Sequence, residues 1–482
     1  MRLVRSRAGI ALALILAAQG CAVGPNYSRP ATVVPPVYKE AGNWVPATPS
    51  DAADKQDWWT LFGDQELSQL EAQVAVSNQT LAAAEAAYRE AHAIVAEQRA
   101  QYFPAVSLNG SADVTGGGST ASTAVLGGGT GSGASGTITS YRLQLGATWE
   151  PDLWGRVRRS VEDAKASAQA SAADLANARL SAQSELAADY IQLRELDELG
   201  RLYAATAEAY RKSLTITQNK HRAGVVALSD VRQAETQLYN ARATFTDVAR
   251  QRAIDEHAIA ILIGKPPAEL TIGSAPWTLK PVAVPAGLPS TLLERRPDVA
   301  AAERRAAASS ANIGVQVAAY FPSLSLTAGG GTAANVVGEL FSAPSLLWSL
   351  GAGLVQTLFD GGARRAQVSA ARAGYDEAVA NYRQTVLTAF GQVEDNLASQ
   401  RVLAAEQGDR QAAFFAAEEA VKIFANEYQA GTIDYTNVMV AQASALSAHE
   451  AEVSLEAARL TTTVDLLVAL GGGWRTTDLP PG

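Results

Sequence analysis

Residues 156–222 read RVRRSVEDAKASAQASAADLANARLSAQSELAADYIQLRELDELGRLYAATAEAYRKSLTITQNKHR. This stretch contains no proline and a single glycine, Gly200. An α-helix rises 1.5 Å per residue, so one helix over the whole stretch would be a rod of roughly 100 Å. Helices of globular proteins average about 11–12 residues. The stretch therefore predicts an elongated helical architecture and argues against a compact enzyme core.

A tight turn and a returning helix are expected after this stretch. The turn is expected at His221-Arg222-Ala223-Gly224, and the returning helix is expected to end at Gly264. Apolar residues of the returning helix occupy two heptad positions three residues apart: Val231, Leu238, Phe245 and Ile259, then Ala234, Ala241, Val248 and Leu262. This pattern is typical of a coiled-coil seam that carries small residues. A purely structural coiled coil is the alternative that these residues leave open.

Composition excludes several classes of protein. The chain has 482 residues and a formal net charge of −9, which argues against a nucleic-acid partner. Beyond residue 20, no run reaches the roughly 18 consecutive apolar residues that a membrane-spanning helix requires.

The amino terminus has the pattern of a bacterial export signal. Three arginines precede an apolar run at residues 8–18, and Gln19-Gly20 then lead to Cys21, the only cysteine of the chain. We therefore expect residues 1–20 to be a lipoprotein signal peptide and Cys21 to be lipidated, although Ala18 stands where such signals usually have leucine. Ordinary cleavage with a free thiol is the alternative. Residues 21–56 are rich in proline and should be extended.

Alternating residues at about 105–150 predict a β-hairpin around a Gly/Ser/Thr-rich loop. Each run is about as long as the 9–11 residues with which a tilted strand crosses a bilayer. Aromatic residues cluster at the feet of the hairpin, as in an interfacial girdle: Tyr102, Phe103, Trp149 and Trp154. A soluble hairpin with an aromatic core is the alternative. The GSGASG run at 131–136 is a loop rather than a nucleotide site, because a strand and not a helix follows it.

The chain repeats itself. Tyr102-Phe103-Pro104 returns as Tyr320-Phe321-Pro322, and the turn at Gly224 returns at Gly431. We expect a first repeat at 57–287, with a helical hairpin at 156–264, and a second repeat at 288–471. The second repeat would have a hairpin at about 323–359 and a helical hairpin at 363–471, followed by a tail at 472–482. Four strands leave two open edges that lipid does not tolerate, so the chain must close by oligomerisation, most simply in a ring.

Four segments resemble one family specifically: CAVGPNYSRP (21–30), DWWTLFGDQEL (57–67), PDLWGRVRRS (151–160) and GLPSTLLERRPDVAAAE (287–303). They are similar to the TolC-like outer membrane efflux lipoproteins of tripartite RND-type pumps, and the resemblance covers nearly the whole mature chain. It implies a homotrimer whose membrane β-barrel of twelve strands continues as an α-helical tunnel in the periplasm. It also implies a periplasmic adaptor, an inner-membrane RND-type pump and outer membrane lipid as partners. No cofactor and no catalysis are implied.

The resemblance makes the two turns the periplasmic tips, where the channel is shut at rest. Asp434 and Asp230 lie where family members have gate carboxylates or their partners, and Asn437 lies where some relatives have a second aspartate. Simple capping of helix N-termini is the alternative for both aspartates. Small residues would form the surface that meets the adaptor: Gly224, Val225, Ala227, Gly431 and Thr432.

The sequence offers no catalytic or metal-binding motif. The four histidines lie far apart in the chain, and there is no cysteine pair or nucleophile elbow. We therefore expect an outer membrane, lipid-anchored exit duct for small toxic compounds or drugs. The same fold in protein secretion or metal export, and a trimeric structural surface protein, are the alternatives.

Overall fold

The computed structural model describes residues 22–41, 55–116, 137–280, 282 and 295–480. Several features of the sequence lie outside these residues: the signal peptide expected at 1–20, Cys21, the loop at 117–136, and the Leu-Pro-Ser run at 288–290.

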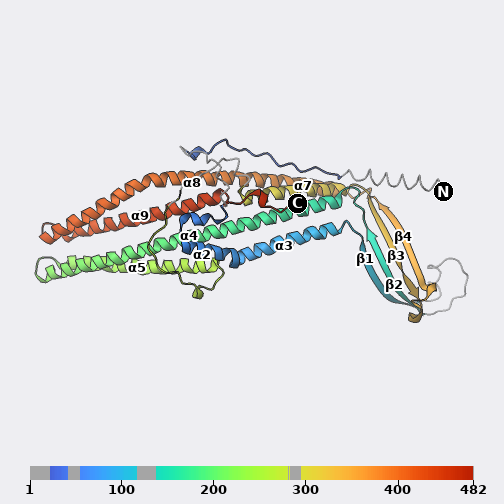
Figure 1. The fold of residues 1–482 in the computed structure, drawn as a ribbon, viewed down its shortest axis with the longest axis horizontal. Coiled ribbons are helices and arrows are strands. Elements are labelled where there is room, and N and C mark those ends of the chain that lie inside the picture. Colours follow the sequence, from blue (N-terminus) through green and yellow to red (C-terminus); the bar gives the residue numbers. More distant parts are fainter. Residues whose placement is uncertain (1–21, 42–54, 117–136, 281, 283–294, 481–482) are drawn as a thin grey trace. The chain divides into compact units, whose positions relative to one another are not determined.

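Two helical hairpins dominate the structure (Figure 1). The first consists of α4 (Arg156–Arg222) and α5 (Leu228–Leu262), and the second of α8 (Ala363–Ala430) and α9 (Tyr435–Ala469). α4 has the bounds predicted from the proline-free stretch at 156–222. Shorter helices precede each hairpin of strands: α2 (Gln65–Ser77) and α3 (Gln79–Ala100), then α7 (Pro297–Ala318). None of the helices in the described residues is long and apolar enough to cross a membrane.

The same backbone motif ends all four helices of the two hairpins. The glycine after α4, Gly224, has φ = 71°, and its N–H donates to the His221 carbonyl while the Val225 N–H donates to the Lys220 carbonyl. This pair of hydrogen bonds is a Schellman motif, which needs a residue in the left-handed region. Gly264, Gly431 and Gly471 adopt the same conformation with equivalent hydrogen bonds.

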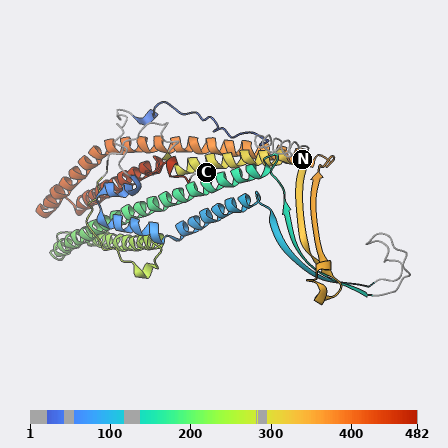
Figure 2. The same ribbon diagram turned by 45° about the vertical axis from the view of Figure 1, so that its right-hand side comes forward.

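The four strands form one antiparallel sheet in the order β1-β2-β3-β4 (Figure 2). β1 (Ala105–Gly116) and β2 (Thr137–Trp149) belong to the first copy of the repeat, and β3 (Ser323–Ala334) and β4 (Leu346–Val355) to the second. β2 pairs with β3, so the two copies share a single sheet. The order of elements, helix, two strands and two long helices, thus occurs twice.

The long helices α4 and α8 begin in the same way. Both carboxylate oxygens of Asp152 accept hydrogen bonds from backbone N–H groups at the start of α4, and Arg158 donates to the same carboxylate at 3.2 Å. Asp360 accepts from the N–H groups of Gly362 and Arg364, and the Arg364 side chain donates to it at 2.6 Å. A carboxylate at a helix N-terminus satisfies free N–H groups and interacts favourably with the helix dipole.

The chain divides into two compact units that do not follow the repeat. One unit contains the sheet with residues 90–168 and 305–378, and the other contains residues 30–89, 169–304 and 379–482. Each unit therefore draws on both copies. The second unit has the larger apolar core, built from α2, α4, α5, α8 and α9 around residues such as Leu67, Leu186, Ile259, Val393 and Leu460.

Candidate functional site

The sheet has one apolar and one polar face. Successive side chains of a strand point to opposite faces, and residues paired across strands share a face. The pairs Leu108–Leu145, Leu145–Gly330 and Leu326–Ala352 place even-numbered residues of β1, β3 and β4 on one face with odd-numbered residues of β2. This face carries large apolar residues: Val106, Leu108, Leu143, Leu145, Trp149, Leu326, Trp348, Leu350 and Leu354.

The opposite face of the same strands is mostly polar. It carries Ser107, Asn109, Ser111, Asp113, Arg142, Gln144, Thr148, Ser325, Thr327 and Ser349. Asp113 accepts a hydrogen bond from Ser111 at 3.1 Å, and Arg142 lies opposite Ser111 in the register.

Much of the apolar face is exposed in the part of the chain that the structure describes. Trp348 and Leu350 of β4 are 77% and 76% exposed, and Leu108 of β1 is 67% exposed. Soluble proteins rarely expose a continuous apolar surface of this extent, which marks a membrane or protein contact. Alternation of apolar and polar residues along each strand is the pattern of transmembrane strands, whose apolar side faces lipid.

Aromatic residues lie at the feet of the strands. The Trp149 indole N–H donates to the Tyr102 carbonyl at 3.0 Å, which joins the two feet of the first hairpin. Trp154 stacks on Phe321 with ring centroids 4.8 Å apart and donates to the Pro322 carbonyl at 2.7 Å. The Arg364 guanidinium lies 5.7 Å from the centre of the Tyr320 ring. Phe103 is 72% exposed, as a residue at a lipid interface can be.

Two exposed residues at the foot of β4 were not predicted from the sequence. Leu358 and Phe359 are 91% and 88% exposed. They lie three and four residues after the end of β4, close to the foot of the strand as Trp149 and Trp154 are to the foot of β2, so the repeat was the signal that could have identified them.

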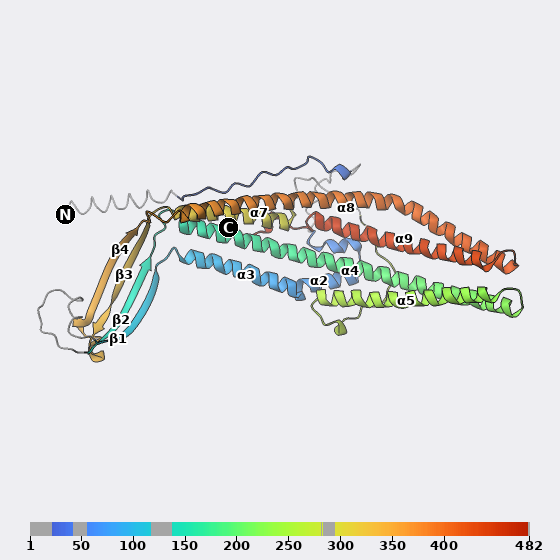
Figure 3. The ribbon, with the colours of Figure 1, turned by 180° about the vertical axis from the view of Figure 1, so that it is seen from behind.

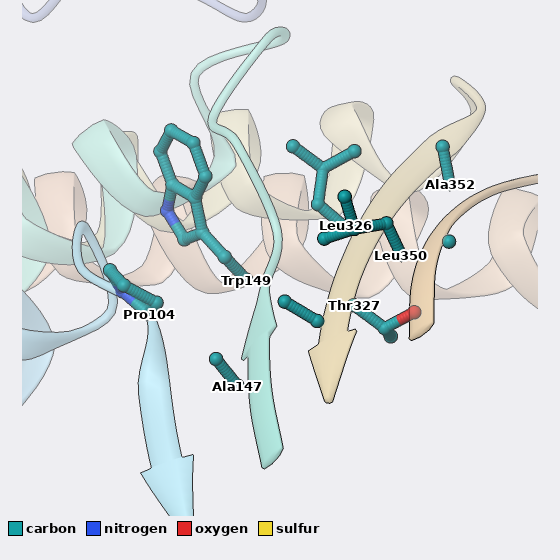
Figure 4. Close-up of a pocket in the computed structure, with 9 residues that line it drawn as sticks. Pro104, Ala147, Trp149, Leu326, Thr327, Leu350 and Ala352 are labelled. Carbon is teal, nitrogen blue, oxygen red and sulfur yellow. The ribbon is translucent and has the colours of Figure 1, made fainter. Parts of the chain in front are cut away.

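A hollow of about 510 Å³ lies at the feet of the strands (Figure 4). Pro104, Trp149, Leu326 and Leu350 are among its lining residues, and Thr327 supplies its one side-chain hydroxyl. No titratable side chain lines it. The hollow therefore suits apolar chains.

The turns of the helical hairpins lie at the same end of the second unit (Figure 3). Gly224, Val225, Ala227, Gly431 and Thr432 are all exposed there, and Val225 keeps 67% of its surface accessible. The structure thus brings together, on two neighbouring turns, the small residues that the sequence suggested as a contact surface.

Neither aspartate of the turns caps a helix through its side chain. Asp434 is the N-cap residue of α9, but its carboxylate makes no capping hydrogen bond. Asp230 is the third residue of α5, whose N-cap residue is Ala227. Asp434 and Asn437 are exposed, whereas Asp230 is half-buried. Asp434 thus occupies the N-cap position of α9 without a side-chain capping bond, and Asp230 lies in the first turn of α5.

Contacts between the two hairpins near the turns were not predicted. The Lys220 ammonium donates to the Tyr428 carbonyl and lies 3.8 Å from the centre of the Tyr428 ring. The Tyr428 hydroxyl lies 3.4 Å from the hydroxyl of buried Thr217, and the Tyr428 and Tyr435 rings are 5.4 Å apart. These contacts connect α4 with α8 and α9. Heptad periodicity within one hairpin carries no signal for them.

Comparison with known proteins identifies relatives along nearly the entire chain. The model of the outer membrane efflux protein family matches residues 70–265 and 288–472. The toluene efflux pump outer membrane protein TtgC of Pseudomonas putida is 32% identical over 94% of this chain and 93% of its own length. The pyoverdine export outer membrane protein OpmQ of Pseudomonas aeruginosa is also 32% identical, over 97% and 96%.

Solved structures agree with this assignment. The outer-membrane channel OprN superposes with a TM-score of 0.86 at 31% identity, covering 94% of this chain and all of the OprN chain. This chain therefore belongs to the outer membrane efflux protein family and acts in the outer membrane as a component of an efflux system.

Proposed function

We propose that three copies of this chain form the passive exit duct of a tripartite pump that expels small toxic compounds. The strands of three chains would close a twelve-stranded barrel with the apolar face toward lipid and the polar face toward the lumen. The observation that carries this proposal is the two-faced sheet with both edges open. In a bilayer core each unpaired backbone group costs on the order of several kcal/mol, as it does in apolar solvents. The unpaired edge strands of the sheet would therefore have to pair with strands of other copies.

The helical hairpins would form the periplasmic tunnel. Their exposed turns offer small and apolar residues, including Val225 and Leu228, to the helical tips of a periplasmic adaptor. The adaptor would connect the duct to an inner-membrane RND-type pump, which supplies the energy. The duct itself would bind no cofactor and catalyse no reaction.

The gate would lie at the same turns. Threefold symmetry turns each inward carboxylate into a ring of three, which narrows a pore and favours cations. Exposed Asp434 is the main candidate, with Asn437 one helical turn further along α9 and Asp230 on the neighbouring hairpin. The Lys220–Tyr428 contact would hold the two hairpins together in the resting state.

A lipid anchor at Cys21 would fix the amino terminus to the membrane. Two residues after Cys21, the Val23 N–H donates to the Trp154 carbonyl at 3.0 Å. Trp154 belongs to the aromatic feet of the sheet, so the anchor would enter lipid beside them. Acyl chains contribute about 0.8 kcal/mol per buried CH₂.

Cysteine labelling in intact cells tests the two-faced sheet. Cys21 is the only native cysteine, so Ser111→Cys and Ala112→Cys each introduce one new thiol on adjacent positions of β1. A membrane-impermeant maleimide should modify Ser111→Cys from the water-filled lumen and leave Ala112→Cys unmodified in lipid. Equal modification of the two thiols would contradict a lipid-facing sheet.

A further inference from the structure

The first residues that the structure describes are held in a clamp beside the feet of the strands. The Val23 N–H donates to the Trp154 carbonyl at 3.0 Å. Buried Arg159 donates to the carbonyls of Val23 and Gly24 at 3.3 and 3.5 Å. It also donates to the Asn26 side-chain oxygen at 2.8 Å. The clamp therefore holds both the backbone and a side chain of this segment.

Close backbone approaches fix the same segment. A Cβ on Gly155 would lie 2.7 Å from the Ala22 Cα, which leaves no room for a side chain there. A Cβ on Gly24 would lie 2.5 Å from the Cα of Gly314 in α7. Consecutive Cα atoms are about 3.8 Å apart, so a lipid on Cys21 would leave the clamp close to Gly155, at the start of α4.

The clamp brings the attachment point of this lipid to the second hairpin of strands. Trp154, whose carbonyl holds Val23, stacks on Phe321 and donates to the carbonyl of Pro322, directly before β3. Leu326 of the apolar hollow follows Pro322 by four residues, about 13 Å along a strand that rises roughly 3.3 Å per residue. An acyl chain fills one leaflet, about half of the ~30 Å hydrocarbon core, so it is long enough to reach the hollow.

We propose that the hollow at the feet of the strands is the seat of an acyl chain carried by Cys21 (Figure 4). The hollow has a volume of about 510 Å³, and its apolar lining includes Trp149, Leu326 and Leu350. The acyl chain packs against the apolar face of the sheet and fills this space, instead of lying free in the bilayer. The proposal rests on the lipid anchor of the proposed function and specifies where its acyl chain lies.

The anchor suits this hollow better than a free phospholipid does. A phospholipid brings a phosphate, which favours a neighbouring cation. Among the described residues that line the hollow, none has a titratable side chain. The arginines at the starts of α4 and α8 are already paired, Arg158 with Asp152 and Arg364 with Asp360. The polar part of a lipid on Cys21 is the peptide itself, whose N–H and carbonyl groups the clamp satisfies.

Photo-crosslinking in outer membranes tests the seat. p-Benzoylphenylalanine replaces Leu350 in one variant and Leu346 in a matched control. Both are exposed leucines on the apolar face of β4, but Leu346 lies four residues nearer the loop end and outside the lining of the hollow. After irradiation and proteolysis, mass spectrometry identifies the molecule that each position has captured.

We expect the Leu350 position to capture the lipid-bearing amino-terminal peptide at least fivefold more than the Leu346 position does. Capture of phospholipid without this peptide at Leu350 would overturn the choice of occupant. Equal capture of the peptide at both positions would show that the acyl chain lies free in the bilayer. Absence of the peptide from both positions would overturn the seat as well.

Two further variants test the clamp in the Leu350 and Leu346 backgrounds. Arg159→Met removes the hydrogen-bond donors but keeps an unbranched side chain in the buried position. The preference for the Leu350 position should then fall at least threefold, because the start of the lipid is no longer held. Asn26→Ala removes one acceptor and leaves Arg159 in place, so it tests the clamp where Arg159→Met does not fold. An unchanged preference in a folded variant would contradict the clamp.

The mass of the amino-terminal peptide from the native chain separates this proposal from the proposed function. A peptide without lipid would remove both the anchor and its seat, while the exit duct would stand. A lipidated peptide that the Leu350 position does not capture would overturn the seat alone.

Discussion

Glu71 on α2 is fully buried, and neither of its carboxylate oxygens has a hydrogen-bond partner among the residues that the structure describes. Burial raises the pKa of this carboxyl to about 9, so it keeps its proton at neutral pH. In the unfolded chain the group ionises at its ordinary pKa of 4.5. Between these two values the folded state holds a proton that the unfolded state has released, so the cost to stability grows as pH rises.

Replacing Glu71 by leucine should remove this cost. One pKa unit corresponds to about 1.4 kcal/mol, so the gain at pH 7 is on the order of 3 kcal/mol. The melting temperature of the Glu71→Leu variant in detergent should exceed that of the native chain, by a margin that widens from pH 5 to pH 8. Glu71→Gln serves as the control, because it does not titrate but leaves a polar group buried. A margin independent of pH would show that the carboxyl is already ionised in the fold.

Asp434 is the residue on which the proposed gate depends most. Asp434→Ala removes the carboxylate ring, so the resting pore should widen and lose part of its preference for cations. Closed-state conductance in planar bilayers should rise several-fold. Asp409→Ala is the matched control, since Asp409 is also an exposed aspartate of the second helical hairpin but lies away from the turn. Equal closed-state conductance in Asp434→Ala and the native chain would exclude Asp434 from the gate.

Sequence reasoning reached some residues of the site and missed others for a physical reason. Trp149 and Tyr102 flank one hairpin, so their contact could be expected from their positions. Trp154 and Phe321 come from different copies, and a repeat does not reveal which parts of the two copies pack together. Lys220 and Tyr428 lie on different helical hairpins. The sequence pattern of each hairpin describes only the packing of its own two helices, so it does not predict this contact.

Among the elements, a glycine-to-alanine substitution should change the stability of the protein in opposite directions in the turns of the helical hairpins and within the helices that they connect. Gly224 has φ = 71°, and a side chain there is strained although the space around it is open. Gly374 lies within α8, where a Cβ would also meet nothing within 4 Å. Gly224→Ala should lower the melting temperature by an amount equivalent to about 1 kcal/mol, while Gly374→Ala should raise it by roughly 0.5–1 kcal/mol. Shifts of the same sign would contradict the left-handed turn.

The elements themselves were largely predictable because their signals are local. A stretch without proline and with the single glycine Gly200 indicated the bounds of α4, and strict alternation indicated the strands around Leu108 and Leu145. The order of the sheet required the structure, because alternation does not say which strand lies beside β2. The structure also shows that the compact units mix residues of both copies, which the repeat alone does not indicate.

For the whole molecule, two copies of one motif are joined in a sheet that remains open at both edges. In the proposed trimer, further copies of the chain would pair with the open edges of the sheet, and its apolar face would lie against lipid. A structural surface protein would use such assembly for strength, whereas an exit duct uses it to enclose a polar path.

Dye efflux in living cells distinguishes these two roles directly. Deleting the gene in its own organism should raise the accumulation of an RND-pump substrate dye such as ethidium and increase sensitivity to detergents and antibiotics. Expression of the native chain should restore both to the parental level. Collapse of the proton gradient should abolish the difference between the strains, because the pump and not the duct supplies the energy. Unchanged accumulation and unchanged sensitivity across dyes, detergents and antibiotics after deletion would contradict the exit duct.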